Sequence, residues 1–510
     1  MKKIGMYLMG IVVLGFLAAC GTNAKSAKDT VVTKKDKLEI ITTFYPMYDF
    51  TKNIVGDEAN VKLMIPAGSE PHDYEPSAKD MATIHDADVF IYHNENMETW
   101  VPKAKKGFAK DRPNIVEGTK DMILLPGGEE EHDHDHGEEG HHHELDPHTW
   151  VSPYRAMKEV KSIKDQLVKL YPKKAKTFET NAEKYLAKLT QLNQQYNAGL
   201  KDAKQKSFVT QHAAFGYLAL DYGLNQVAIS GLSPEQEPSA SRLGELKEYV
   251  KDNGIQYIYF EKNANDKIAE TLASEANVKL AVLNPLESLT KEQIADGEDY
   301  ISVMKENLQA LEKTTNVAGK NVKQEMPQDT AVKTVANGYF ADSAVKNRKL
   351  SDYTGKWQSV YPLLQAGALD QVFDYKAKQN KDMTAAEYKA YYDTGYKTDV
   401  EKINITANTI EFVVDGKTYK YEYVAKGYKI LNYEKGNRGV RFLFEAKGDA
   451  GRFKYVQFSD HNIAPQKTAH YHIFFGGKSQ ESLFTQMHNW PTYYPDNLSK
   501  YAIAQEMMAH

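Results

Sequence analysis

Residues 172–200 have the sequence PKKAKTFETNAEKYLAKLTQLNQQYNAGL, and this stretch sets how the first part of the chain folds. Its apolar side chains recur at three- and four-residue spacing, at Phe178, Ala182, Tyr185, Leu189, Leu192 and Tyr196. That spacing places them on one face of an α-helix roughly 45 Å long. Pro172 is expected to begin this helix, and Ser152 followed by Pro153 predicts the start of an earlier one.

Short apolar runs lie on both sides of this long helix. They are Leu38–Phe44, Val61–Pro66, Asp88–His93, Phe208–His212, Gln256–Glu261 and Val278–Asn284. The runs are continuous rather than alternating, which is typical of parallel strands buried on both faces by helices. We therefore expect an α/β fold with two lobes joined by the long helix.

The last third of the chain has a different pattern. Apolar and polar residues alternate over short runs within residues 401–458, with Asp415-Gly416 as a turn signal. This pattern predicts an antiparallel β-barrel or sandwich. Helical segments are expected at Ser343–Leu350 and Thr384–Asp393. Residues 314–334 are polar without apolar periodicity and are interpreted as a linker.

The first 20 residues have the features of a lipoprotein signal peptide. Lys2 and Lys3 precede an apolar run that is too short for a membrane span and ends in Leu17-Ala18-Ala19-Cys20, which resembles the bacterial lipobox. Lipidated Cys20 would anchor the mature chain at the membrane, with polar residues 21–37 as a tether. The alternative is an ordinary signal peptide with an incidental cysteine.

Composition excludes some functions. Cys20 is the only cysteine, so the mature chain has no disulfide or thiolate metal site. The net charge of −5 over 510 residues gives no indication of nucleic-acid binding. The chain lacks HExxH, P-loop and Gly-x-Ser-x-Gly motifs, which argues against the common hydrolases.

Four residues of the α/β part are candidate metal ligands: His72, His148, His212 and Glu287. At least three follow predicted strands directly, where open α/β sheets place their ligands. Imidazole and carboxylate groups suit tetrahedral zinc. Taken singly, each could equally be a loop or cap residue.

Three motifs in this part resemble a known family. They are Pro71-His72-Asp73-Tyr74-Glu75-Pro76, Asp146-Pro147-His148-Thr149-Trp150 and Gly231-Leu232-Ser233-Pro234-Glu235-Gln236-Glu237-Pro238. Residues 38–313 resemble the solute-binding proteins of bacterial zinc ABC transporters. The resemblance implies that His72, His148, His212 and Glu287 bind zinc. Three imidazoles fit zinc better than manganese, which prefers oxygen ligands.

Residues 129–144, EEEHDHDHGEEGHHHE, contain no apolar side chain. Such a segment cannot form a core and is expected to be a solvated loop. Its histidines are His132, His134, His136, His141, His142 and His143. Zinc-specific members of the family carry a loop of this kind here, so we interpret it as a low-affinity zinc collector. The alternative is a merely acidic, soluble loop.

A second candidate site lies near the C-terminus. His470 and His472 are two residues apart, so a strand would point both to the same face, and His461 precedes them in a loop. Asp460-His461-Asn462-Ile463-Ala464-Pro465, His470-Tyr471-His472 and Asn489-Trp490-Pro491-Thr492-Tyr493-Tyr494-Pro495 resemble the ZinT family. That resemblance covers residues 335–510 and implies a lipocalin-like barrel with His461, His470 and His472 as zinc ligands. His488 and His510 have no match.

The two resemblances together predict an extracellular, membrane-anchored zinc-binding lipoprotein. It would act as a monomer, capture Zn²⁺ in both domains and deliver it to an ABC permease driven by its ATPase subunit. Two alternatives were weighed. A zinc enzyme would use an open metal position for catalysis, and a surface adhesin would use zinc only structurally.

Overall fold

The structure is a computed structural model that describes residues 37–108, 113–127, 145–234, 238–261, 267–319, 334–335, 337–433 and 436–508. Cys20, the signal segment, residues 21–36 of the tether and the histidines of loop 129–144 lie outside these residues. Within the described ranges, no helix has the length and apolar character needed to cross a membrane.

The first half of the α/β part is built on a four-stranded parallel sheet with strand order β2-β1-β3-β4. Its strands are β1 (Leu38–Thr42), β2 (Ala59–Leu63), β3 (Val89–Tyr92) and β4 (Asn114–Glu117). The helices are α1 (Tyr45–Val55), α2 (Ala78–Asp86) and α3 (Val101–Lys105). Every residue of β3 is buried, as the continuous apolar run predicts.

A second four-stranded parallel sheet, in the order β6-β5-β7-β8, forms the other half. Its strands are β5 (Ser207–Thr210), β6 (Asn225–Ala228), β7 (Tyr257–Phe260) and β8 (Lys279–Val282). The helices are α6 (Gly216–Tyr222), α7 (Ala240–Asp252), α8 (Lys267–Ala276), α9 (Lys291–Ala295) and α10 (Tyr300–Thr315). Two separate parallel sheets confirm the prediction of two lobes.

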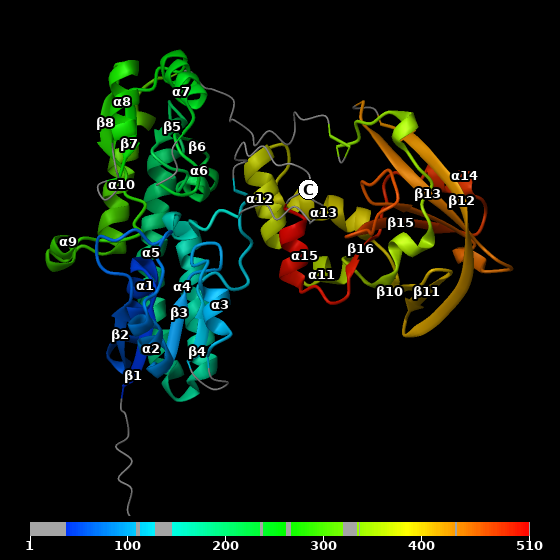
Figure 1. The fold of residues 1–510 in the computed structure, drawn as a ribbon, viewed down its shortest axis with the longest axis horizontal. Helices are drawn as coiled ribbons and strands as arrows, with labels where there is room; N and C mark the ends of the chain where they lie inside the picture. Colours follow the sequence, from blue (N-terminus) through cyan, green and yellow to red (C-terminus); the bar gives the residue numbers. More distant parts are fainter. Residues whose placement is uncertain are drawn as a thin grey trace, which may run out of the picture. The chain divides into compact units, whose positions relative to one another are not determined.

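Two long helices connect the sheets. They are α4 (Pro153–Leu170) and α5 (Ala175–Leu200), and a short 3₁₀ turn at Pro172–Lys174 precedes α5. All six predicted apolar residues of α5 are buried. The helix contacts α1 of the first half and both α6 and α10 of the second, so one apolar core extends through both halves (Figure 1). The predicted connecting helix is thereby confirmed.

The last third of the chain forms a closed antiparallel barrel of eight strands, drawn mainly in orange in Figure 1. Its strands are β9 (Gly355–Ser359), β10 (Val400–Ile405), β11 (Thr409–Val414), β12 (Lys417–Asn432), β13 (Arg438–Ala446), β14 (Tyr455–Ser459), β15 (Tyr471–Gly476) and β16 (Thr492–Pro495). Strands β9 and β10 pair with each other, which closes the barrel. Aromatic side chains such as Trp357, Phe458 and Tyr471 fill its interior.

The remaining helices of this part are α11 (Tyr361–Gln365), α12 (Asp370–Asn380), α13 (Ala385–Tyr396), α14 (Gln480–Phe484) and α15 (Lys500–Glu506). Helix α13 matches the segment predicted at Thr384–Asp393. Thr384 caps it by accepting a hydrogen bond from Glu387 N, while Glu387 caps Thr384 N in return.

The helix predicted at Ser343–Leu350 is wrong. That segment holds only a 3₁₀ turn at Asp342–Ala344, and another follows at Leu350–Tyr353. Between them the buried Arg348 side chain pairs with Asp460, which is far away in sequence. Tertiary contacts thus override the local helical pattern.

Candidate metal centres

The loops that follow strands bring four predicted side chains together in the α/β part. His72 lies beyond β2, His212 beyond β5 and Glu287 beyond β8, while His148 precedes a 3₁₀ turn at Thr149–Val151 that leads into α4. Strand ends thus supply three of the four groups, as expected for parallel sheets. One nitrogen or oxygen atom from each residue falls in a cluster in which all ligand atoms lie within 4.8 Å of one another.

The separations within this cluster fit a tetrahedral zinc ion. His72 Nε2 lies 3.1 Å from His148 Nε2. Glu287 Oε1 lies 3.4 Å from the Nε2 atoms of His72 and His148, and 3.3 Å from Nε2 of His212. Zinc bonds of 2.0–2.1 Å in tetrahedral geometry place neighbouring ligand atoms about 3.3 Å apart. The backbone therefore holds the four groups at the spacing a zinc ion needs.

The polar atoms at the centre of the cluster lack other partners. Nε2 of His212 and Oε1 of Glu287 are buried and make no hydrogen bond within the described structure. Buried polar groups in native proteins are nearly always paired, so two orphaned atoms that face each other indicate a missing ligand. A divalent cation satisfies both.

Carboxylates orient two of the imidazoles from behind. Asp146 Oδ1 accepts hydrogen bonds from His148 Nδ1 at 2.8 Å and from His148 N at 2.9 Å. Nδ1 of His212 bonds to Glu261. Because Nδ1 is engaged in both rings, Nε2 is directed at the cluster. The carboxylate that accepts from Nδ1 also makes Nε2 a stronger ligand for a metal ion.

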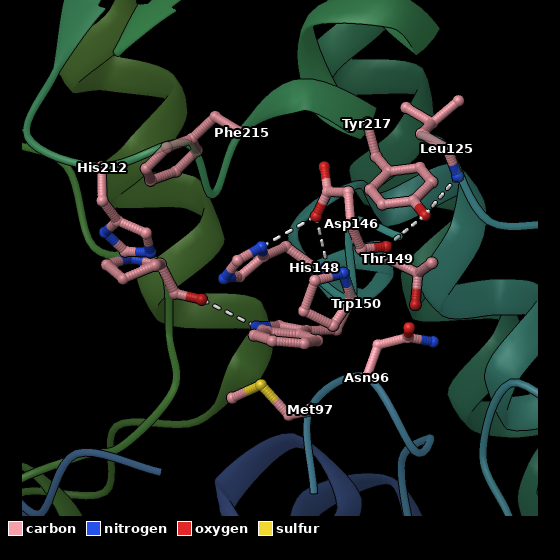
Figure 2. A network of polar contacts seen from close by, with 12 residues as sticks. Asn96, Met97, Leu125, Asp146, His148, Thr149, Trp150, His212, Phe215 and Tyr217 are labelled. Carbon is pink, nitrogen blue, oxygen red and sulfur yellow. Dashed lines mark hydrogen bonds and ion pairs between the residues drawn. The ribbon is translucent and has the colours of Figure 1, made fainter. Parts of the chain in front are cut away.

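A further layer of contacts fixes the segment that carries His148 (Figure 2). The Tyr217 hydroxyl donates to the carbonyl of Asp146 at 2.6 Å and accepts from Leu125 N at 2.8 Å. Trp150 Nε1 donates to the carbonyl of Pro285 at 2.7 Å, which ties this segment to the loop of Glu287. The ligands thus belong to one bonded framework.

Glu287 follows a residue in a strained backbone conformation. Leu286 has a φ of 62°, in the left-handed region that is costly for a residue with a large side chain. Its amide donates to Asn284 Oδ1 at 2.7 Å, and Asn307 Nδ2 donates to the Asn284 carbonyl at 2.6 Å. These bonds hold the turn that aims Glu287 at the three histidines.

The electrostatics of this cluster favour a cation. Burial alone would raise the pKa of Glu287, but the adjacent rings of His148 and His212 outweigh it and hold the pKa well below its usual range. Burial likewise opposes charge on His212, yet Glu261 and Glu287 raise its pKa well above the ordinary value. The site therefore stabilises positive charge at its centre, where protons and a metal ion compete.

Glu70 is a further carboxyl group beside the cluster. Its Oε1 accepts a hydrogen bond from His72 N at 2.9 Å. Burial, reinforced by Glu287, raises the pKa of Glu70 to about 9 in the metal-free site. Glu70 supports the loop of His72 through this hydrogen bond.

The second predicted site is also assembled. His461, His470 and His472 each contribute one ring nitrogen to a group in which the ligand atoms lie within 4.8 Å of one another. His461 is exposed, His470 is buried and His472 is half-buried. Tyr471 points into the barrel between them, so the alternation expected of a strand places both flanking histidines on the outer face. The group contains no carboxylate.

Neighbouring strands orient two of these rings. Thr492 lies opposite His472 in the pairing of β15 with β16. Its hydroxyl donates to the carbonyl of Trp490 at 3.0 Å and therefore accepts from His472 Nδ1 at 2.7 Å. With Nδ1 engaged in this bond, Nε2 is the ring nitrogen of His472 that would bind a metal. The ring of His470 stacks on Tyr494, with centroids 5.0 Å apart.

Sequence reasoning identified the seven clustered side chains but not their supporting partners. Asp146 and Glu261 gave usable signals, since one stands in the quoted histidine motif and the other ends a predicted strand. Thr492 and Tyr494 lie within the aromatic motif that includes Trp490. Among the described residues, the two groups above are the sets of three or more ligand-type side chains able to hold a metal, and His488 belongs to neither.

Comparisons with known proteins agree with this two-part organisation. Residues 40–314 match the family described as ZnuA, zinc-uptake complex component A, periplasmic. Residues 331–510 match ZinT (YodA), periplasmic lipocalin-like zinc-recruitment.

The chain also matches relatives over their whole length. The chain is 63% identical to the zinc-binding lipoprotein AdcA of Streptococcus pneumoniae over the whole of both chains. It is 53% identical to the zinc-binding protein AdcA of Streptococcus pyogenes, again over both full lengths. The crystal structure of Zn(II)-bound AdcA from S. pneumoniae covers 93% of this chain and 100% of its own, with a TM-score of 0.85.

Proposed function

The chain belongs to the AdcA family of zinc-binding proteins, and on that premise we propose that it captures Zn²⁺ at two sites and delivers it to the permease of an ABC importer. It is a protein of a zinc uptake system with a ZnuA-like and a ZinT-like domain. The first site consists of His72, His148, His212 and Glu287, and the second of His461, His470 and His472. The zinc ion is the cargo of both.

The preformed geometry of the first site carries this proposal. The four ligand atoms come from separate loops. In the four atom pairs given above they lie 3.1–3.4 Å apart, which is the spacing of tetrahedral zinc. Three of the four side chains are fully buried, and the orphaned atoms of His212 and Glu287 face one another. A site closed by four protein ligands leaves no position for a substrate, which favours binding and release over catalysis.

Other parts of the function rest on the sequence. Lipidation of Cys20 would retain the protein at the extracellular face of the cell membrane, beside the permease that the ATPase subunit drives. The histidines of residues 129–144 would collect zinc weakly beside His148. All seven proposed ligands belong to one chain, which supports a monomer.

Loss of one ligand tests the first site. His212→Ala removes an imidazole, so zinc binding there should weaken strongly while the second site stays intact. A ligand stabilises the native state by RT ln(1 + [L]/Kd), about 4 kcal/mol at a thousandfold excess over Kd. Calorimetry should therefore show a large zinc-induced rise in the melting temperature of the α/β transition in the wild type and a small one in the variant.

His85→Ala is the matched control, because His85 is an exposed histidine of α2 outside both groups. It should respond to zinc like the wild type. Equal zinc-induced shifts in the wild type and His212→Ala would exclude His212 as a ligand and remove the basis of the four-ligand site.

A further inference from the structure

The backbone at His461 is held in an unfavourable conformation. Its φ is 62°, in the left-handed region that non-glycine residues seldom adopt, although histidine tolerates it better than most. His461 is exposed, and the rings of His470 and His472 lie 5.7 and 5.8 Å from its own ring, centroid to centroid. The direction of this side chain also depends on what holds the neighbouring backbone.

Arg348 holds that backbone at two points. Its Nη1 donates to both carboxylate oxygens of Asp460, at 2.5 and 2.6 Å, directly before His461 in sequence. Its Nη2 donates to the carbonyl of Gln466 at 2.6 Å, in the middle of the segment between His461 and His470. One guanidinium thus fixes both the start and the centre of the loop that carries the exposed histidine.

The surroundings of Arg348 make this anchor rigid. The residue is 2% exposed, and its guanidinium lies 4.4 Å from the ring centroid of Tyr353. Two backbone bonds from the same segment reach the loop as well. Lys346 N donates to the carbonyl of Ile463 at 2.9 Å, and Thr468 N donates to the carbonyl of Asp352 at 3.1 Å.

We propose that Arg348 is a positioning residue of the second zinc site, which sets the direction of His461 through Asp460 and Gln466. This inference rests on the proposed role of His461, His470 and His472 as zinc ligands. Arg348 touches no ligand side chain in the contacts described above. It acts by keeping the loop in the one conformation that completes the three-histidine group.

The chemistry of the contact requires arginine. A guanidinium presents several donors in a fixed planar fork, so it can bond a carboxylate and a carbonyl in different directions at once. A lysine ammonium keeps the charge but has no such fork. Arg348→Lys should therefore preserve the ion pair in part while releasing the loop.

The barrel contains a matched control in Arg441. It is also buried, at 4% exposed, and donates to the carbonyls of Leu483 and Gln486 at 2.6 and 2.8 Å. Its guanidinium packs on the ring of Phe474. Arg441 thus resembles Arg348 in burial and in bonding to a loop, but that loop carries no histidine of the zinc group.

The experiment measures zinc affinity of the second site alone, in the full-length His212→Ala protein. Zn²⁺ is titrated against a chromophoric chelator in the parent and in added Arg348→Lys, Asp460→Asn and Arg441→Lys variants. Arg348→Lys should weaken zinc binding roughly tenfold, the lower end of the loss seen when a direct partner of a metal ligand is removed, because Arg348 acts through Asp460 and Gln466. Asp460→Asn keeps the side-chain shape and should weaken binding less, while Arg441→Lys should match the parent.

Two further readouts separate positioning from a loss of stability. Co²⁺ bound in place of Zn²⁺ should give weaker visible absorption bands in Arg348→Lys than in Arg441→Lys, because a misplaced His461 alters the coordination. The zinc-free melting temperature should fall in both. Parent-like zinc affinity in Arg348→Lys and Asp460→Asn overturns the inference, as does an equal loss in Arg441→Lys.

The proposed function has its own arm in the same experiment. Adding His472→Ala to the parent should abolish tight zinc binding. If that protein still binds one zinc ion tightly, the three-histidine site is wrong and the inference falls with it. If binding is abolished but Arg348→Lys behaves like the parent, only the role of Arg348 is wrong.

Discussion

His212 shows how a proposed zinc ligand depends on a residue outside the cluster. Its Nδ1 bonds to Glu261, so only Nε2 is available to the cluster. Glu261 is buried, and Gln211 Oε1 also lies within hydrogen-bonding distance of the Glu261 amide. The carboxylate fixes the tautomer of His212 and adds negative charge behind it.

Glu261→Gln tests this support. Glutamine keeps the size of the side chain but removes the charge that makes the imidazole a stronger donor. Zinc affinity of the first site should fall roughly 10- to 100-fold, as for other outer-shell partners of metal-binding histidines. Chelator competition in a His472→Ala background, which leaves only the first site, measures the change.

Glu275→Gln is the control for a lost carboxylate. Glu275 forms a 3.2 Å ion pair with Lys247 on the surface of the same lobe, and its side chain is 55% exposed. This variant should bind zinc like its parent. If Glu261→Gln also does so, the carboxylate behind His212 has no influence on the metal.

Partner residues can be predicted from the sequence where both belong to one local motif. His148 and its partner Asp146 stand within five consecutive residues, so both were visible together. Arg348 and Asp460 are 112 positions apart, and nothing in either local sequence links them. Contacts of that kind are fixed by the closed barrel and cannot be derived from spacing along the chain.

Among the elements, α1 and α5 are joined by a buried polar contact. The Tyr185 hydroxyl on α5 donates to Asp49 Oδ2 on α1 at 2.5 Å. Burial raises the pKa of Asp49 to about 6, although the bond from Tyr185 opposes the shift. Since the pKa is raised above the unfolded value of about 3.9, the ionised carboxylate destabilises the fold at neutral pH.

Asp49→Asn should therefore stabilise the α/β part in a pH-dependent way. At pH 8 the wild type carries the full cost of the buried charge. A native pKa of about 6 against about 3.9 in the unfolded chain makes this cost at most about 3 kcal/mol. As pH falls through 6 toward 4, Asp49 becomes protonated in the native state and the advantage of asparagine shrinks, to roughly half at pH 5. Calorimetry of zinc-free protein at pH 8 and pH 5 measures this difference.

Asp202→Asn provides the comparison, because the Asp202 side chain is 87% exposed. Its melting temperature relative to the wild type should be the same at both pH values. The contrary result is an Asp49→Asn protein that melts below the wild type by the same amount at pH 8 and pH 5. It would mean that the hydrogen bond from Tyr185 outweighs the cost of the buried charge.

Elements with strong periodicity were predictable and short polar ones were not. The buried face of α5 spans several turns, and β3 and β5 are buried at every position. Strands β4 and β6, with sequences NIVE and NQVA, each include polar residues in only four positions and were not predicted. Their strand conformation follows from pairing with β3 and β5.

At the scale of the whole molecule, the two sites offer zinc different environments. The first group has three buried side chains, and its carboxylate would neutralise part of the charge of the ion. The second group has three imidazoles, one of them exposed, and no carboxylate. A cation is attracted far more strongly by a carboxylate in a buried site than by one surrounded by water. The first site should therefore bind Zn²⁺ more tightly.

This difference predicts both the number of bound ions and their order of release. The intact protein should retain two zinc ions after removal of loosely bound metal. His212→Ala and His472→Ala should retain one each, and the double variant none. Deletion of residues 129–144 should leave both tight ions, because all seven proposed ligands lie outside those residues. Elemental analysis after dialysis against a weak chelator gives these counts.

The order of release follows from increasing chelator strength. The ion of the His212→Ala protein, held only by His461, His470 and His472, should be lost at a lower chelator concentration than the ion of His472→Ala. That order suits a domain that collects zinc and passes it to a tighter site, because transfer then runs downhill in free energy. If the three-histidine site instead holds its ion against the stronger chelator, zinc cannot pass spontaneously in that direction, and the barrel would act as a store and not as a collector.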